Sequence, residues 1–187
     1  MPQCEHMLLM VAIMTDMIQL LEPLIPALRR YARSLLRDRT AADDLVQDCL
    51  ERAIAHWSQR RAGGDARSWV FTILHNLAMT ELKRRAARSS DVDFESAEAW
   101  LPAPPSHESG LHYRELLRAL AMLPEEQRAV VLLVSIEDLS YTDAAKVLRI
   151  PVGTVMSRLS RAREKLRESV NGNSAGPAER SHLRRVK

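Results

Sequence analysis

Apolar residues recur every three or four positions through most of the chain after Pro23, which is the spacing that lines one face of an α-helix. Three consecutive stripes of this kind predict three amphipathic helices in the first half of the chain. We expect Thr40 to cap the second helix, and a loop at residues 60–65, where two glycines precede the third helix. The inward-facing residues are Ile25, Leu28, Ala32, Leu35 and Leu36; Leu45, Val46, Cys49, Leu50, Ala53 and Trp57; and Val70, Ile73, Leu74 and Leu77.

The same spacing returns near the middle of the chain and predicts a second set of helices. Ser140 is placed to cap a short helix that Pro151 and Gly153 end, and a longer amphipathic helix, from about Val152 to Val170, follows at once. No strand-type alternation of apolar and polar residues occurs, so the predicted fold class is all-α, with two small helical modules joined by a flexible linker.

The chain divides at a stretch of different composition. Residues 89–112 lack Lys and Arg, carry several acidic residues and three prolines, and show no apolar periodicity, which predicts the linker. The modules are then expected at residues 21–88 and 113–170. Residues 1–20 are assigned to an uncertain N-terminal extension, and residues 171–187 to a basic, disordered tail.

Composition adds a charge asymmetry to this picture. The 187 residues carry a formal net charge of +3, but residues 1–145 have a net charge of −5 and residues 146–187 a net charge of +8. A basic end of this kind favours contact with nucleic acid. Two cysteines make neither a disulfide framework nor a four-ligand zinc site, and Cys49 lies on an apolar stripe. We expect a cytoplasmic protein with no membrane insertion, no enzymatic activity, no metal and no cofactor.

The two C-terminal predicted helices form a helix–turn–helix pattern. The second of them buries Val155, Leu159, Ala162 and Leu166, so its other side presents Arg and Ser near its N-terminus. Arg side chains read guanine edges in the major groove, and hydroxyl groups contact bases or phosphates. The candidate duplex-reading residues are Thr154, Met156, Ser157, Arg158, Ser160, Arg161 and Arg163.

The third predicted helix presents amides, hydroxyls, an aromatic ring and a basic end, which suit unstacked single-stranded bases and their phosphates. Spacing alone gives equal weight to a core tryptophan beside a solvated polar face. The candidate residues are Trp69, Thr72, His75, Asn76, Met79, Lys83 and Arg84.

The second predicted helix presents an outward acidic face. No histidine or glycine loop accompanies its carboxylates, so a solvated or protein-docking face is favoured over a metal site. The residues of this face are Asp44, Gln47, Asp48, Glu51 and Arg52.

Four motifs in order resemble the extracytoplasmic-function (ECF) sigma factors of bacterial RNA polymerase. They are DDLVQDCLERA (43–53), SWVFTILHNLA (68–78), LPEEQRAV (123–130) and PVGTVMSRLSRAR (151–163). The resemblance implies a region-2 module and a region-4 module without regions 1 and 3. It assigns the acidic face to docking on core RNA polymerase, the loop 62–67 and the third helix to recognition and melting of the −10 element, and the last helix to the −35 element.

Met156 stands where many members of this family carry a basic residue. Methionine there is similar to the branch that serves the general stress response of alphaproteobacteria, in which an anti-sigma protein sequesters the sigma factor. The implied partners are thus core RNA polymerase, promoter DNA and an anti-sigma factor. Two other readings stay open: a stand-alone helix–turn–helix regulator that binds an operator without polymerase, and an adaptor that binds only proteins.

Overall fold

The structure, a computed structural model, describes residues 14–60, 64–88 and 109–174, and every regular element in these ranges is helical. The all-α prediction is confirmed there, and no helix among these residues is long and apolar enough to cross a membrane. After a helix over residues 14–21, the elements are η1 (Glu22–Leu24), α2 (Ile25–Leu36), α3 (Arg39–Ala55), η2 (Trp57–Gln59), α4 (Ala66–Arg88), α5 (Ser109–Met122), α6 (Glu125–Val131), the π-helical η3 (Leu132–Ile136), α7 (Tyr141–Leu148) and α8 (Val152–Ser174).

The first module is a bundle in which α2, α3 and α4 pack around a core of large side chains. Tyr31 and Phe71 are fully buried, and their rings meet edge to face with centroids 5.5 Å apart. Cys49 is buried in the same core as predicted, and burial raises the pKa of its thiol to about 12. This cysteine is therefore a small apolar core residue rather than a reactive one.

The start of α3 differs from the sequence prediction. Arg37 ends α2 in the left-handed conformation, with φ 54°, and this leaves Asp38 extended ahead of the helix. The Asp38 carboxylate accepts a hydrogen bond from the backbone N–H of Ala41 at 3.0 Å, so Asp38 is the N-cap and Thr40 already lies inside the helix. The predicted cap at Thr40 was wrong because this reversal completes the turn two residues earlier.

The second module packs α5, α6 and α7 against the long helix α8. Its apolar centre includes Val130, Leu133, Val147 and Val155, all fully buried. The helix predicted over residues 125–135 changes to π-helical geometry at Leu132, where the Glu137 N–H donates to the Leu132 carbonyl at 2.9 Å.

Three predicted boundaries also need correction. Residues 14–21 of the uncertain N-terminal extension form a helix, α5 begins at Ser109 inside the predicted linker, and α8 continues to Ser174 inside the predicted tail. The rest of the linker and tail predictions, at residues 89–108 and 175–187, falls outside the described residues.

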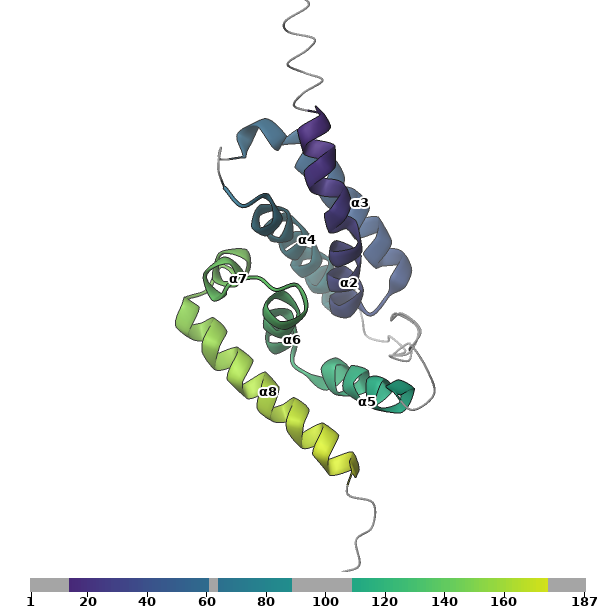
Figure 1. Cartoon of the computed structure of the whole chain (residues 1–187). Coiled ribbons are helices and arrows are strands. Elements are labelled where there is room, and N and C mark those ends of the chain that lie inside the picture. The colour runs from purple at the N-terminus through teal and green to yellow at the C-terminus, as the bar shows by residue number, and fades with distance from the viewer. Residues whose placement is uncertain (1–13, 61–63, 89–108, 175–187) are drawn as a thin grey trace, which may run out of the picture.

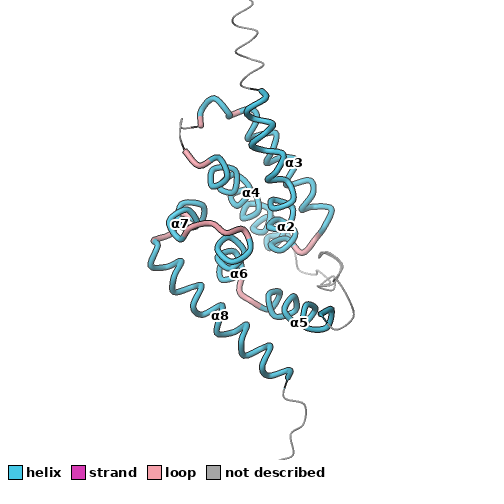
Figure 2. Tube along the Cα trace, viewed as in Figure 1, coloured by secondary structure: helices cyan, strands magenta, loops and turns pink. Residues whose placement is uncertain are grey.

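The two modules lie against each other (Figures 1 and 2), with α4 packed on α7 and α2 on α6. Arginines bond across this seam to backbone carbonyls. The buried Arg128 of α6 donates to the Ser34 carbonyl of α2 at 3.1 Å, and Arg37 donates to the Ala121 carbonyl of α5. Guanidinium groups thus satisfy carbonyls at helix ends that no intrahelical donor reaches.

His75 lies under this seam and generates a pH prediction. Its Nδ1 is 2.9 Å from the Tyr31 hydroxyl, and burial, reinforced by the positive charge of Arg149, lowers its pKa to about 4. Between pH 6.5 and 4 the unfolded chain binds a proton that the folded chain does not. The free energy of unfolding should therefore decrease by up to about 3 kcal/mol as the pH is lowered from 6.5 to 4.

Urea titrations across this pH window measure the effect, with the His75→Gln variant as the control. Carboxylates titrate in both proteins, so the difference between the two pH profiles isolates the histidine. Parallel profiles would show that His75 is protonated to the same extent in the folded and unfolded chains.

Candidate nucleic-acid interface

The helix–turn–helix is built by local capping and a tight reversal. The Ser140 hydroxyl accepts from the Asp143 N–H at 3.0 Å, as predicted, and begins α7. Arg149 ends α7 in the left-handed conformation with φ 53°, and the Ile150 N–H returns to the Ala145 carbonyl at 3.1 Å. The small, buried Ala144 lets α7 cross close to α8.

The outer face of α8 carries the predicted duplex-reading residues. Val155, Leu159 and Ala162 are buried, which confirms the inward side of the helix. A shallow open hollow of about 230 Å³ lies on the outer face, lined by Tyr141, Met156, Leu159, Ser160, Arg163 and Arg167. Met156, Ser157, Ser160, Arg161 and Arg163 are exposed, and Thr154 is half-buried.

Arg158 does not belong to this exposed face. Its guanidinium pairs with the Glu126 carboxylate of α6 at 2.6 Å, and the Arg158 side chain is 24% exposed. The sequence placed Arg158 among the DNA-contacting residues because its position is one turn from Arg161 and Thr154. The structure instead pairs it with Glu126 of α6.

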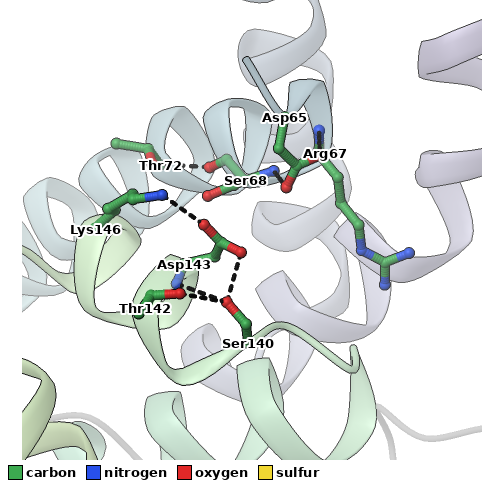
Figure 3. A network of polar contacts seen from close by, with 8 residues as sticks. All are labelled: Asp65, Arg67, Ser68, Thr72, Ser140, Thr142, Asp143 and Lys146. Atoms are coloured by element: carbon green, nitrogen blue, oxygen red, sulfur yellow. Dashed lines mark hydrogen bonds and ion pairs between the residues drawn. The ribbon is translucent and has the colours of Figure 1, made fainter. Parts of the chain in front are cut away.

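The candidate single-strand face of α4 is partly covered. His75 and Ser68 are buried, and Trp69, Thr72, Asn76 and Met79 are half-buried. The expectation that His75 is exposed was wrong, because α2 supplies Tyr31 to it and α7 packs along this side of α4. Figure 3 shows Ser140, Asp143 and Lys146 of α7 beside Ser68 and Thr72.

Trp69 lies near the beginning of α4, where the predicted loop ends. Its ring meets Trp57 edge to face at 6.1 Å, and Arg60 lies over the other ring with its guanidinium carbon 4.8 Å from the Trp57 centroid. The Asp65 carboxylate caps α4 by accepting from the Ser68 N–H at 3.0 Å. Trp69 is therefore anchored in the core while part of its ring faces solvent, which combines the two roles that spacing left open.

The basic end of α4 is more accessible than its middle. Lys83 and Arg84 are exposed, and Arg84 pairs with Glu81 one turn earlier at 2.6 Å. The neighbouring Arg85 instead reaches back to Asp38 at 2.7 Å and fixes the α3 cap. This end of α4 presents the exposed positive charges of Lys83 and Arg84.

The acidic face of α3 is exposed as predicted. Asp44, Asp48 and Glu51 point to solvent, and Gln47 donates to Glu51 at 3.1 Å. Arg52 is exposed beside them. No group of three or more His, Cys, Asp or Glu side chains suited to a metal ion occurs in the described parts of the chain. The arrangement suits docking of a basic protein surface.

Sequence reasoning missed one site, at Glu137. This glutamate is 1% exposed at its side chain and belongs to the second module, yet its partners are Arg30 and Arg67 of the first. We call these three residues the clasp. The only sequence signal was an acidic pair, Glu137 and Asp138, directly after an apolar run, and nothing in it names a partner 107 positions away.

Comparison with known proteins finds a family match in each module. Residues 21–75 match the family described as the Sigma2 domain of PhyR, and residues 113–166 match Sigma-70, region 4. The chain is 39% identical over 142 residues to the ECF RNA polymerase sigma factor EcfG of Rhodopseudomonas palustris, a match that covers 76% of this chain and 78% of that protein.

Solved structures give the same result. The chain is similar to the sigma factor RpoE in its co-crystal structure with the anti-sigma factor NepR from Bartonella quintana, with a TM-score of 0.73 and 34% identity over 83% of this chain and 97% of that one. It is also similar to CnrH in complex with the cytosolic domain of CnrY, with a TM-score of 0.64 and 27% identity over 86% of this chain and 90% of that one.

Proposed function

Because the chain belongs to the ECF sigma factors of RNA polymerase, we propose that its two modules direct core RNA polymerase to the two elements of a promoter. The observation that carries this proposal is the face of α8, where exposed Arg and Ser side chains follow a capped helix–turn–helix. The protein is then a transcription initiation factor of the cytoplasm. A stand-alone regulator would leave the acidic face of α3 and the polar face of α4 without a role.

Recognition of duplex DNA at the −35 element is assigned to α8. Arg161 and Arg163 are exposed beside the hydroxyl groups of Ser157 and Ser160, so this face offers both bidentate cations and hydrogen-bonding groups to a major groove. Met156 adds an exposed apolar contact in place of a cation. Arg158 pairs with Glu126 and is not assigned to DNA.

Recognition of the melted −10 strand is assigned to α4 and the loop before it. Trp69 offers part of a ring for stacking, Asn76 and Thr72 offer polar groups, and Lys83 and Arg84 offer charge to the phosphates. His75 takes no direct part, because it is buried against Tyr31. Since α7 packs on this side of α4, binding of the strand requires the two modules to separate.

Docking on core polymerase is assigned to the exposed carboxylates of α3. Core polymerase then holds the modules at a fixed separation, and the joint affinity for two weakly bound promoter elements rises through effective concentration. The relatives RpoE and CnrH were solved with the proteins NepR and CnrY, the first of which is called an anti-sigma factor. By this likeness we propose that an anti-sigma protein controls this chain and that the chain serves a stress response.

Run-off transcription tests the proposal directly. Purified bacterial core polymerase is combined with the chain and a library of genomic promoter fragments, with core polymerase alone as the control. We expect transcripts that begin at defined promoters only when the chain is present. Binding of the chain to a palindromic operator, with no transcript from any fragment, would favour the stand-alone regulator instead.

The assignment of α8 predicts a split between two arginines of the same helix. Arg161→Ala should lower the affinity of the holoenzyme for a duplex −35 element by about 1–3 kcal/mol, because a charge-assisted contact is lost. Arg158→Ala is the matched control and should leave this affinity nearly unchanged, since that guanidinium faces Glu126. Filter binding at one fixed salt concentration measures both, and equal losses would contradict the assignment.

The assignment of α3 predicts a charge-reversal effect on polymerase binding. Asp48→Arg should weaken binding to core polymerase at least tenfold, because a like charge then faces the basic docking surface. Asp16→Arg is the control, since Asp16 is an exposed acidic residue of the first module outside α3. Surface plasmon resonance on immobilised core polymerase gives both dissociation constants, and an unaffected Asp48→Arg chain would move the docking site away from α3.

A further inference from the structure

The clasp brings a buried carboxylate of the second module to two cations of the first. Arg30 donates from Nε and Nη2 to the two carboxylate oxygens of Glu137, at 3.1 and 3.0 Å. Arg67 donates from Nη2 to the Glu137 backbone carbonyl at 2.6 Å and to its Oε2 at 3.3 Å. The Arg30 pair is bidentate, which is the strongest geometry for a guanidinium and an oxyanion.

Both arginines extend from elements of the first module. Arg30 extends from α2, while Arg67 stands in the first turn of α4 with its backbone N–H bonded to Asp65 at 3.1 Å. The Arg67 guanidinium carbon lies 5.7 Å from the centroid of the Phe71 ring, which belongs to the same module. Its Nε is buried and has no hydrogen-bond partner among the described residues.

The ligand of this pair need not be a carboxylate. A guanidinium group donates hydrogen bonds to carboxylate and phosphate oxygens in the same bidentate geometry. A phosphodiester also carries the same single negative charge as Glu137. The unused Nε–H of Arg67 shows that Glu137 leaves one donor of the site unfilled. Two positive charges beside one carboxylate also favour a ligand from a polyanion.

The position of the pair identifies the phosphate. Arg67 stands in the first turn of α4, the helix assigned to the melted strand, at the same end of the helix as Trp69 but on another side of it, so it offers a cation to the backbone of a strand that crosses this end. We propose that Arg30 and Arg67 form a phosphate site of the first module for single-stranded promoter DNA, and that Glu137 occupies this site while the modules are packed together. This inference rests on the proposed function.

Glu137 and DNA cannot occupy the site formed by Arg30 and Arg67 at the same time. When Glu137 holds both arginines, α7 also lies along α4, so one movement of the second module vacates the phosphate site and uncovers the strand-binding face. Exchange of one oxyanion for another conserves the charge balance at the site. The cost of removing two charged groups from water offsets most of the attraction in a buried ion pair, so its net contribution to stability is small. A phosphodiester is therefore able to compete with Glu137.

The test measures binding of a fluorescein-labelled single-stranded oligodeoxynucleotide to the full chain by fluorescence anisotropy. Glu137→Gln removes the internal competitor and should tighten binding about tenfold, the effect of one charge-assisted contact. Glu22→Gln makes the same change of charge at an exposed residue of the first module and should leave binding unchanged. Small-angle X-ray scattering of the same samples should show an expanded chain only for Glu137→Gln.

The gain must depend on the two arginines. Adding Arg30→Ala and Arg67→Ala to the Glu137→Gln chain should return the affinity to the wild-type value or below. Tighter binding that survives loss of both arginines, or a Glu137→Gln chain that expands without any gain in affinity, overturns the proposal. Competition with inorganic pyrophosphate distinguishes a site for free phosphate from a site for the phosphates of a DNA strand. A site that binds pyrophosphate but not the oligonucleotide is not a strand site.

A second measurement keeps the test decisive if Glu137→Gln does not fold, as judged by circular dichroism. In the chain with Glu137 intact, Arg30→Ala with Arg67→Ala should lower the slope of log affinity against log salt by about 0.7, the value for one single-strand phosphate. An unchanged slope overturns the proposal. These assays contain no polymerase, so a failed run-off reaction beside a confirmed phosphate site would reject the promoter function alone.

Discussion

A carboxylate is buried at a cost of several kilocalories per mole unless cations and donors surround it, and the packing of the two modules depends on how Glu137 meets this condition. Among the described residues, the cations that pair with it are Arg30 and Arg67 of the first module, so its charge is compensated when these two are in reach. The rest of the seam follows the same chemistry, since Arg128 bonds to a carbonyl of the first module and Arg37 to one of the second. These polar contacts fix one orientation of the modules, beside an apolar cluster that is continuous across the seam.

The candidate single-strand face of α4 overlaps the seam between the two modules. Each module has its own apolar centre, around Tyr31 and Phe71 in one and around Val130 and Val155 in the other. Buried apolar residues of both modules also form one continuous cluster, so the seam combines apolar packing with polar and aromatic groups that also suit nucleic acid. The α4 face is therefore half-buried in the packed arrangement, whereas the α8 face and the acidic face of α3 are exposed in it.

The helices were predictable because apolar periodicity is a local property, and it placed buried residues such as Cys49 and Leu159 correctly. The exposed face of α8 followed from the same periodicity. Arg158 and His75 were misplaced because their partners, Glu126 and Tyr31, are 32 and 44 positions away in the sequence, and a helical period carries no information about them. Thr40 has a side chain suited to capping, but Asp38 caps α3 because the left-handed conformation of Arg37 ends the turn before Asp38. The clasp was not predictable from the sequence for the same reason, because Arg30 and Glu137 are 107 positions apart.

The charge asymmetry of the chain does not by itself bring the modules together. An acidic body and a basic end attract each other, but exposed charges further apart than about 8 Å are largely screened at physiological salt. All three residues of the clasp lie within residues 1–145, the acidic part of the chain, so the clasp does not join the acidic part to the basic end. Short, partly buried pairs resist screening, so the seam depends on contacts such as the clasp and those of Arg128 and Arg37 rather than on net charge. The basic end of the chain is thereby left to interact with DNA, in either arrangement of the modules.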